Sequence, residues 1–232
     1  MRLLVLAALI SATVAGPAVA TTRTFPVGGF DRIRNTVPFD VRVHTGARPS
    51  ARASGPQKIL DRLVIDVRNG ELVVGTRRGS WISSWTWNRN SEPVVIDIAV
   101  PALSAAALDG PGAIRIDRVQ GRSFTASLSG PGDMTIASLQ AGNVDFRLAG
   151  PGNIVAAGRV ASARLDLSGP GDIRAMGLTV RDAAISVSGP GSIALTATGA
   201  VRGSLSGPGD ITVRGGAQCD IRKSGPGAVH CG

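Results

Sequence analysis

The tripeptide Gly-Pro-Gly occurs seven times between Gly110 and Gly227, and this repeat restricts the possible folds more than any other feature. Successive copies begin 20, 20, 19, 20, 18 and 18 residues apart. A period near 20 residues indicates one supersecondary unit that is copied and stacked, with each copy burying its apolar face against the next. The copies are Gly110-Pro111-Gly112, Gly130-Pro131-Gly132, Gly150-Pro151-Gly152, Gly169-Pro170-Gly171, Gly189-Pro190-Gly191, Gly207-Pro208-Gly209 and Gly225-Pro226-Gly227.

Two columns of apolar residues frame these tripeptides. The first stands two residues before each copy and consists of Leu108, Leu128, Leu148, Leu167, Val187 and Leu205. The second stands four residues after the first glycine and consists of Ile114, Met134, Ile154, Ile173, Ile193, Ile211 and Val229. Alternating apolar residues continue on both sides, which is typical of strands with one buried face. Each column therefore predicts a continuous ladder in the core.

The tripeptide itself favours a corner over a hairpin. Proline presets φ at the second position of a turn, and the following glycine would supply the positive φ of a type II turn, whereas two-residue hairpins use type I′ or II′ turns. The sequence thus predicts an all-β fold, a parallel β-helix with two or three short strands in each coil. An antiparallel meander with long loops is the competing interpretation.

The first 20 residues have the pattern of a signal peptide. One basic residue precedes an apolar run that extends from Leu3 to Ala15, and Ala18-Val19-Ala20 provides a small-residue cleavage site. Cleavage is predicted after Ala20. No later stretch reaches 18 apolar residues, so we expect no transmembrane segment after signal removal. The expected localisation is the periplasm, the cell surface or the extracellular medium.

Residues 21–107 are predicted to be β structure without the Gly-Pro-Gly corner. Asn69-Gly70 lies between two alternating segments in LVIDVRNGELVVGT, which predicts a hairpin with a type I′ turn. This region should form either irregular early coils or a small sheet that closes the stack. Residues 108–232 should form the repeat β-helix, with the last coil as a cap, because Lys223 replaces leucine in the first apolar column.

The two cysteines, Cys219 and Cys231, flank the seventh tripeptide. Thiols tend to pair in an oxidising compartment, so we expect a disulfide that fastens the last coil. Reactive or metal-binding thiols are the alternative.

The chain resembles the auto-transporter adhesin head GIN domain proteins of bacterial envelopes. The resemblance covers nearly all of the mature chain and rests on FPVGGFDRIRNTVPFDVRV, LVIDVRNGELVV, PVVIDIAVPALSAAALDG and the serial SGPGDI units. It implies a right-handed β-helix that binds at the cell surface, and it names no catalytic residues.

A polar column directly after each corner is the best candidate for an enzyme site. It reads Ala113, Asp133, Asn153, Asp172, Ser192, Asp210 and Ala228. Carboxylates on alternate coils would stand about 10 Å apart, too far to share one ion, so we expect these side chains to bond to turn amides instead. His44 and His230 are the only histidines. No catalytic residue, metal ligand or cofactor is therefore predicted.

All three tryptophans, Trp81, Trp85 and Trp87, lie in the segment WISSWTW of a chain without tyrosine. Tryptophan can stack on sugars or anchor a protein partner. With Arg77, Arg78 and Arg89 beside them, the tryptophans form a candidate binding site. The alternative is that they cover the open end of the stack.

The net charge of +9 suggests anionic partners such as acidic glycans or lipopolysaccharide headgroups. The arginines are spread along the chain, which equally fits solubility, and no nucleic-acid motif is present. The sequence thus predicts a non-catalytic exported envelope protein, an adhesin-like or structural module that binds a glycan, an anionic surface or a protein partner through a β-helix face and the tryptophan segment. A polysaccharide-active lyase or hydrolase on the same scaffold is the alternative.

Overall fold

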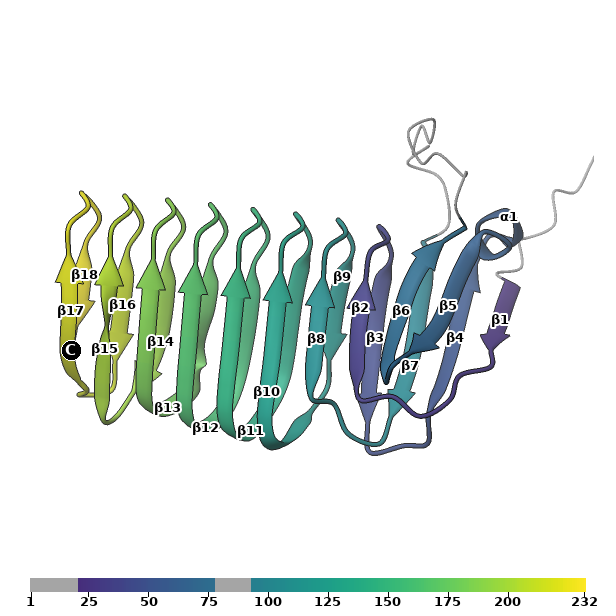
Figure 1. Ribbon diagram of the computed structural model, residues 1–232, viewed down its shortest axis with the longest axis horizontal. Helices are drawn as coiled ribbons and strands as arrows, with labels where there is room; N and C mark the ends of the chain where they lie inside the picture. The colour runs from purple at the N-terminus through teal and green to yellow at the C-terminus, as the bar shows by residue number, and fades with distance from the viewer. Residues whose placement is uncertain (1–20, 78–92) are drawn as a thin grey trace, which may run out of the picture.

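The computed structural model describes residues 21–77 and 93–232, which form a stack of β coils with one short helix (Figure 1). The N-terminal elements are β1 (Thr21–Phe25), β2 (Arg32–Asn35), β3 (Asp40–Thr45), β4 (Ser50–Gly55), α1 (Gln57–Leu60), β5 (Leu63–Arg68), β6 (Glu71–Thr76) and β7 (Val95–Val100). The elements of the repeats are β8 (Ala105–Leu108), β9 (Ala113–Ile116), β10 (Val119–Leu128), β11 (Asp133–Leu148), β12 (Ile154–Leu167), β13 (Ile173–Val187), β14 (Ile193–Ala197), β15 (Ala200–Leu205), β16 (Ile211–Arg214), β17 (Gln218–Lys223) and β18 (Val229–Cys231).

Each coil contributes one strand to each of two facing layers. The entry sheet contains the strands that run into the corners: β6, β2, β8, β10, the C-terminal parts of β11, β12 and β13, then β15 and β17. The exit sheet contains the strands that leave the corners: β7, β3, β9, the N-terminal parts of β11, β12 and β13, then β14, β16 and β18. We call the side with the Gly-Pro-Gly turns the corner edge and the opposite side the bend edge.

Neighbouring coils pair in parallel, which confirms the predicted β-helix and excludes the meander. In the entry sheet Leu128 pairs with Leu148, and Leu148 pairs with Leu167. In the exit sheet Met134 pairs with Ile154 in the same way. The two predicted apolar columns are thus continuous ladders in the structure, because successive members of each column lie on neighbouring coils. Figure 1 shows the coils winding in the right-handed sense that the family resemblance implied.

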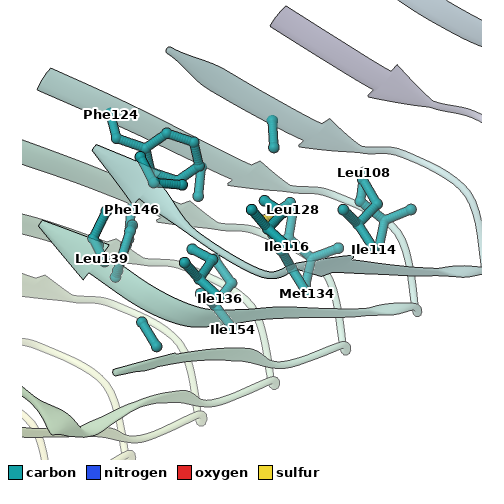
Figure 2. Packing of buried hydrophobic residues seen from close by; sticks show 14 of the residues in the cluster. Leu108, Ile114, Ile116, Phe124, Leu128, Met134, Ile136, Leu139, Phe146 and Ile154 are labelled. Atoms are coloured by element: carbon teal, nitrogen blue, oxygen red, sulfur yellow. The ribbon is translucent and has the colours of Figure 1, made fainter. Parts of the chain in front are cut away.

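The core of the repeats consists of these ladders, other inward-facing aliphatic residues and two phenylalanines. Phe124 and Phe146 are almost completely buried, and Figure 2 shows them beside the aliphatic files that run along the stack. Phe146 pairs with Ala126 on one side and Leu165 on the other, so a large side chain lies between a small one and a medium one. Each coil therefore buries its apolar surface mainly against its two neighbours.

The N-terminal region contains both of the structures that the sequence left open. The pairs β2/β3 and β6/β7 are parallel coils, whereas β4 and β1 add antiparallel strands to β7 at the end of the stack. The predicted hairpin joins β5 to β6, and Asn69 and Gly70 have φ of 51° and 76°, as a type I′ turn requires. The coil β2/β3 lies between β6/β7 and β8/β9, so the order of coils in space differs from their order in the chain (Figure 1).

The first corner in the chain has the sequence Val-Pro-Phe and lacks the Gly-Pro-Gly signature of the others. Asn35 pairs with Leu108 and Val41 pairs with Ile114, so Pro38 occupies the place of Pro111. The Asn35 side chain is buried and fastens this corner from within: its Nδ2 donates to the Phe39 carbonyl at 3.2 Å, and its Oδ1 accepts from the Val37 amide at 3.1 Å.

The prediction of type II turns is wrong. No glycine of the seven Gly-Pro-Gly copies has a positive φ. Glycine is required there because the corners of adjacent coils touch through their backbones. A Cβ atom at Gly132 would overlap the carbonyl oxygen of Gly112, and one at Gly152 would overlap that of Gly132. The glycines of the repeat therefore serve stacking rather than turn conformation.

The last coil differs from the others in two ways. Lys223 pairs with Leu205 and is exposed, so the first apolar column ends in a charge. Cys219 of β17 and Cys231 of β18 form the predicted disulfide, with their Cα atoms 6.6 Å apart. The bridge joins the two outermost strands of the repeat end.

Candidate binding surface

The polar column after the corners forms a ladder of hydrogen bonds between coils. Asp133 Oδ1 accepts from the Asn153 amide at 3.0 Å, and Asp172 Oδ1 accepts from the Ser192 amide at 3.0 Å. Asp210 Oδ1 accepts from the Ala228 amide at 2.7 Å. The predicted bonds to turn amides exist, but each side chain reaches the next coil rather than its own. The column therefore takes part in the stacking of the coils.

This ladder predicts that two substitutions of Asp172 destabilise the protein to different degrees. The Oδ2 atom of Asp172 also pairs with Arg174 at 3.0 Å. Asp172→Ala removes the acceptor of the Ser192 amide and should lower the free energy of unfolding by about 1–2 kcal/mol. Asp172→Asn keeps a side-chain carbonyl, as Asn153 does in the preceding coil, and should cost less than about 0.5 kcal/mol. Urea unfolding of both variants checks the difference. Equal losses would show that the Arg174 pair, rather than the amide bond, carries the effect.

The predicted tryptophan site falls mostly outside the described residues. Trp81, Trp85, Trp87, Arg78 and Arg89 are not among them, whereas the Arg77 amide donates to the Arg62 carbonyl at 3.1 Å. The flanking strands give the point of attachment: β6 ends at Thr76 and β7 begins at Val95, on the two sides of the corner edge. The described ends of β6 and β7 thus lie at the corner edge.

The outer face of the entry sheet carries two neighbouring grooves. The first has a volume of about 370 Å³ and the second about 740 Å³. Both extend over consecutive coils of the same strands. The first is lined along its polar side by Asp109, Ser127, Ser129, Arg147, Asp166, Ser168, Ser186 and Ser188. The second is lined by Ser123, Thr125, Asn143, Asp145, Ser162, Arg164, Asp182 and Arg202, among others. Sequence reasoning missed these grooves, although the serines recur with the period of the corners.

Four charged residues alternate in sign where the two grooves meet. Along β11, Arg147 pairs with Asp145 at 2.6 Å, and along β12, Arg164 pairs with Asp166 at 2.8 Å. The strand register places Asp145 beside Arg164 and Arg147 beside Asp166. The hydrogen bond that Arg164 Nε donates to Asp166, with the negative charges of both carboxylates, raises the pKa of Arg164. The quartet is thus neutral and mutually paired.

Asp182, at the side of the second groove, is held in its charged form. The Ala200 amide donates to its Oδ1 at 3.1 Å, and Arg181 Nε lies 2.9 Å from its Oδ2. The hydrogen bond from Ala200, followed by that from Arg181, lowers the pKa of Asp182 below its ordinary value. A catalytic acid at neutral pH needs the opposite shift.

The two histidines lie far apart in the register of the exit sheet. His44 Nδ1 is 3.5 Å from Asp117 Oδ2, and His230 pairs with Thr212 near the other end. Within residues 21–77 and 93–232, no three histidine, cysteine, aspartate or glutamate side chains gather in a group that could hold a metal ion.

The sequence of the chain matches that of a known protein family. Residues 29–217 match the family described as "Putative auto-transporter adhesin, head GIN domain". The chain belongs to this head GIN domain family. The match begins just before β2 and ends just before β17, so it spans the irregular coils as well as most repeats of the head GIN domain.

Solved structures share the fold of this head GIN domain at low sequence identity. A "putative adhesin" from Bacteroides fragilis has a TM-score of 0.85 at 22% identity, covering 92% of this chain and 97% of that one. A "putative lipid binding protein" from Parabacteroides distasonis has a TM-score of 0.69 at 20% identity, covering 94% and 98%. A "putative adhesin" from Parabacteroides merdae has a TM-score of 0.68 at 16% identity, with the same coverage. Comparison with curated proteins finds none that matches.

The described part of this head GIN domain contains no helix with the length and apolar character needed to cross a membrane. Its single helix, α1, has four residues.

Proposed function

We propose that this protein is a non-catalytic exported binding module of the cell envelope that holds a hydroxyl-rich glycan along the outer face of the entry sheet. The pair of grooves on that face, lined by polar side chains in register on successive coils, carries the proposal. Five coils from the corner of Asp109 to that of Ser188 span about 20 Å at the usual strand spacing. A surface of this shape suits an extended chain that lies parallel to the stack.

The lining chemistry supports a neutral ligand with many hydroxyl groups. Five serines line the first groove, and two serines and a threonine line the second. The two linings together hold four carboxylates and three guanidinium groups, so the net charge of this face is small. Hydroxyl and carboxylate oxygens accept hydrogen bonds from sugar hydroxyls, and serine and arginine can donate to them.

Asp145 adds an acceptor to the same face. Its Oδ1 is buried and has no hydrogen-bond partner among the described residues. A buried acceptor without a donor is costly. A ligand hydroxyl that entered the second groove could reach this oxygen after a small side-chain rotation and so relieve the cost.

The tryptophan segment is proposed as the second part of the surface. In the entry sheet the register runs from Val74 through Asn35 to Leu108, and Asp109 of the first groove directly follows Leu108. The segment with Trp81, Trp85 and Trp87, flanked by Arg77, Arg78 and Arg89, therefore begins at the corner edge two coils from that groove. Tryptophan rings there could stack on sugars at the end of the bound chain.

The carboxylate arrangement supports binding rather than catalysis. Asp145 and Asp166 are paired with arginines, and the pKa of Asp182 is lowered. A polysaccharide hydrolase, one form of the alternative function, would need an unpaired carboxylate whose pKa is raised to act as the general acid. Export is supported by the signal-like residues 1–20, which lie outside the described residues, and by the disulfide between Cys219 and Cys231.

Glycan-array binding by the mature protein tests the groove. Ser127→Leu combined with Ser186→Leu fills the first groove and should reduce retention on the selected neutral glycan at least about tenfold. The matched control, Thr135→Leu with Thr212→Leu, places the same side chains on the outer face of the exit sheet and should bind normally. Unchanged retention in the serine variant would reject the groove, and release of shortened glycan products would favour the enzyme.

Trp85→Ala with Trp87→Ala tests the second part of the surface on the same array. Reduced retention with an unchanged unfolding curve is expected. If this variant retains the glycan as well as the wild type does, the tryptophan segment is not part of the site.

A further inference from the structure

A third groove, which we call the bend-edge groove, lies on the bend edge, away from the two grooves of the entry sheet. It has a volume of about 1070 Å³. Its lining is Gly121, Gln140, Ala141, Gly158, Arg159, Val160, Ala161, Thr179, Arg181 and Thr198. None of these residues is acidic, whereas four carboxylates line the entry-sheet grooves. The bend-edge groove therefore carries a net positive charge, whereas the entry-sheet grooves carry charges of both signs.

One column of the bend edge holds two arginines that small residues keep apart, and of these Arg181 lines the groove whereas Arg122 lies beyond the lining. In the strand register Arg122 is followed by Gly142, Ala161 and Arg181 on successive coils. Three coil steps separate the two arginines by about 14 Å. Gly142 and Ala161 leave space between them, and Arg159 lies in the neighbouring column, which reads Gln120, Gln140, Arg159 and Thr179.

The charge of these arginines is only partly neutralised. Within the part of the chain that the structure describes, neither Arg122 nor Arg159 makes an ion pair. Arg181 is held by Asp182 through Nε alone, which leaves its two terminal nitrogens to donate into the groove. Guanidinium groups bind oxyanions through paired hydrogen bonds, and the neighbouring Gln140 and Thr179 side chains can add donors.

We propose that the bend-edge groove binds an anionic polysaccharide, a chain that carries sulfate, carboxylate or phosphate groups. Arg159 and Arg181 line the groove on adjacent coils, and Arg122 continues the line of cations along the stack beyond the lining, which suits a linear polymer with repeating charges. Arg159 and Arg181 line a recess instead of a flat surface, and this favours a chain over a membrane. The proposal is independent of the entry-sheet site, because the two surfaces share no lining residue.

Binding of the mature protein to dextran sulfate, with uncharged dextran as the reference, tests this proposal at about 0.15 M salt, where long-range charge effects are screened. The decisive pair is Ala161→Glu and Ala161→Gln, because Ala161 is exposed and lines the groove, and the two new side chains differ mainly in charge. Ala161→Glu should weaken binding at least about tenfold relative to Ala161→Gln. Equal affinities would overturn the site.

A second comparison separates a local site from the overall positive charge. Arg159→Gln with Arg181→Gln should weaken dextran sulfate binding at least about tenfold. Arg48→Gln with Arg52→Gln removes the same charge from exposed positions in and directly before β4 and should change binding less than about threefold. Equal weakening in both variants would show non-specific attraction and reject the groove.

Vesicles of phosphatidylglycerol and phosphatidylcholine distinguish the polysaccharide from a lipid surface. The wild type should bind dextran sulfate in preference to these vesicles. Binding to vesicles that depends on Arg159 and Arg181, without binding to dextran sulfate, would overturn the proposal in favour of a membrane ligand.

Discussion

Replacing Gly152 by alanine is expected to lower the free energy of unfolding by at least about 4 kcal/mol. The new Cβ would overlap the carbonyl oxygen of Gly132 in the preceding coil, and the nearby Pro131 backbone leaves little room for a shift. Backbone cannot move aside as a flexible side chain can, so the clash must separate the two coils. Because each coil is held mainly by its neighbours, this opening would divide the stack near its middle. Urea unfolding followed by far-UV circular dichroism measures the loss.

Gly29→Ala is the matched control for this substitution. A Cβ at Gly29 meets no atom within 4 Å, and its φ is not positive. We expect a change below about 0.5 kcal/mol. If the Gly152→Ala variant unfolds at the same urea concentration as the Gly29→Ala variant, the corners do not need glycine for stacking.

The second large effect is expected at Phe146, which has 0% exposure. Phe146→Ala should lower the free energy of unfolding by about 3–5 kcal/mol, since a buried phenylalanine leaves a large cavity. Its partner in β10 is alanine, Ala126, which is too small to fill the space that the ring leaves. Hydrogen exchange should increase first in β10, β11 and β12, the strands that contact the cavity.

Val155→Ala is the control for the loss of apolar volume. Val155 is 37% exposed on the outer face of the exit sheet, so its removal leaves no closed cavity. A change below about 1 kcal/mol is expected. If Phe146→Ala costs no more than this, the phenylalanine does not fill the core between the two sheets.

The repeat architecture could be predicted because its signal is periodic. Leucine and isoleucine at fixed distances from Gly-Pro-Gly indicated two buried ladders, and Leu148 and Ile154 lie in them. The Asn69-Gly70 turn was equally clear, because a type I′ turn demands positive φ at both central residues. These features depend on local geometry that repeats or on a turn with strict chemistry.

The parts that could not be predicted depend on contacts between coils. The role of the corner glycines was misassigned, because a missing Cβ suggests a positive φ when the neighbouring coil is not known. The corner at Pro38 was missed because Val37 and Phe39 replace its glycines. Only the distance of Pro38 from Asn35 and Val41, equal to that of Pro111 from Leu108 and Ile114, could have indicated it.

The binding surfaces were harder to predict for the same reason. The serines Ser168 and Ser188 recur at the corner period, but the quartet around Asp145 forms only when β11 and β12 lie in register. The sequence showed arginines spread along the chain. The structure shows that many are paired on the two sheets, while Arg159 is not, which gives the bend edge its charge.

The insertion of β2/β3 between β6/β7 and β8/β9 has a consequence for how the molecule assembles. Nearly interchangeable SGPGDI units could in principle associate out of order, shifted by one whole unit. In the N-terminal coils β6 already pairs with one edge of β2. The other edge of β2 is therefore the one on which β8 pairs. Once β8 has paired with β2, each later unit can add only to the free end of the stack. The N-terminal coils would thus set the register of all the following repeats.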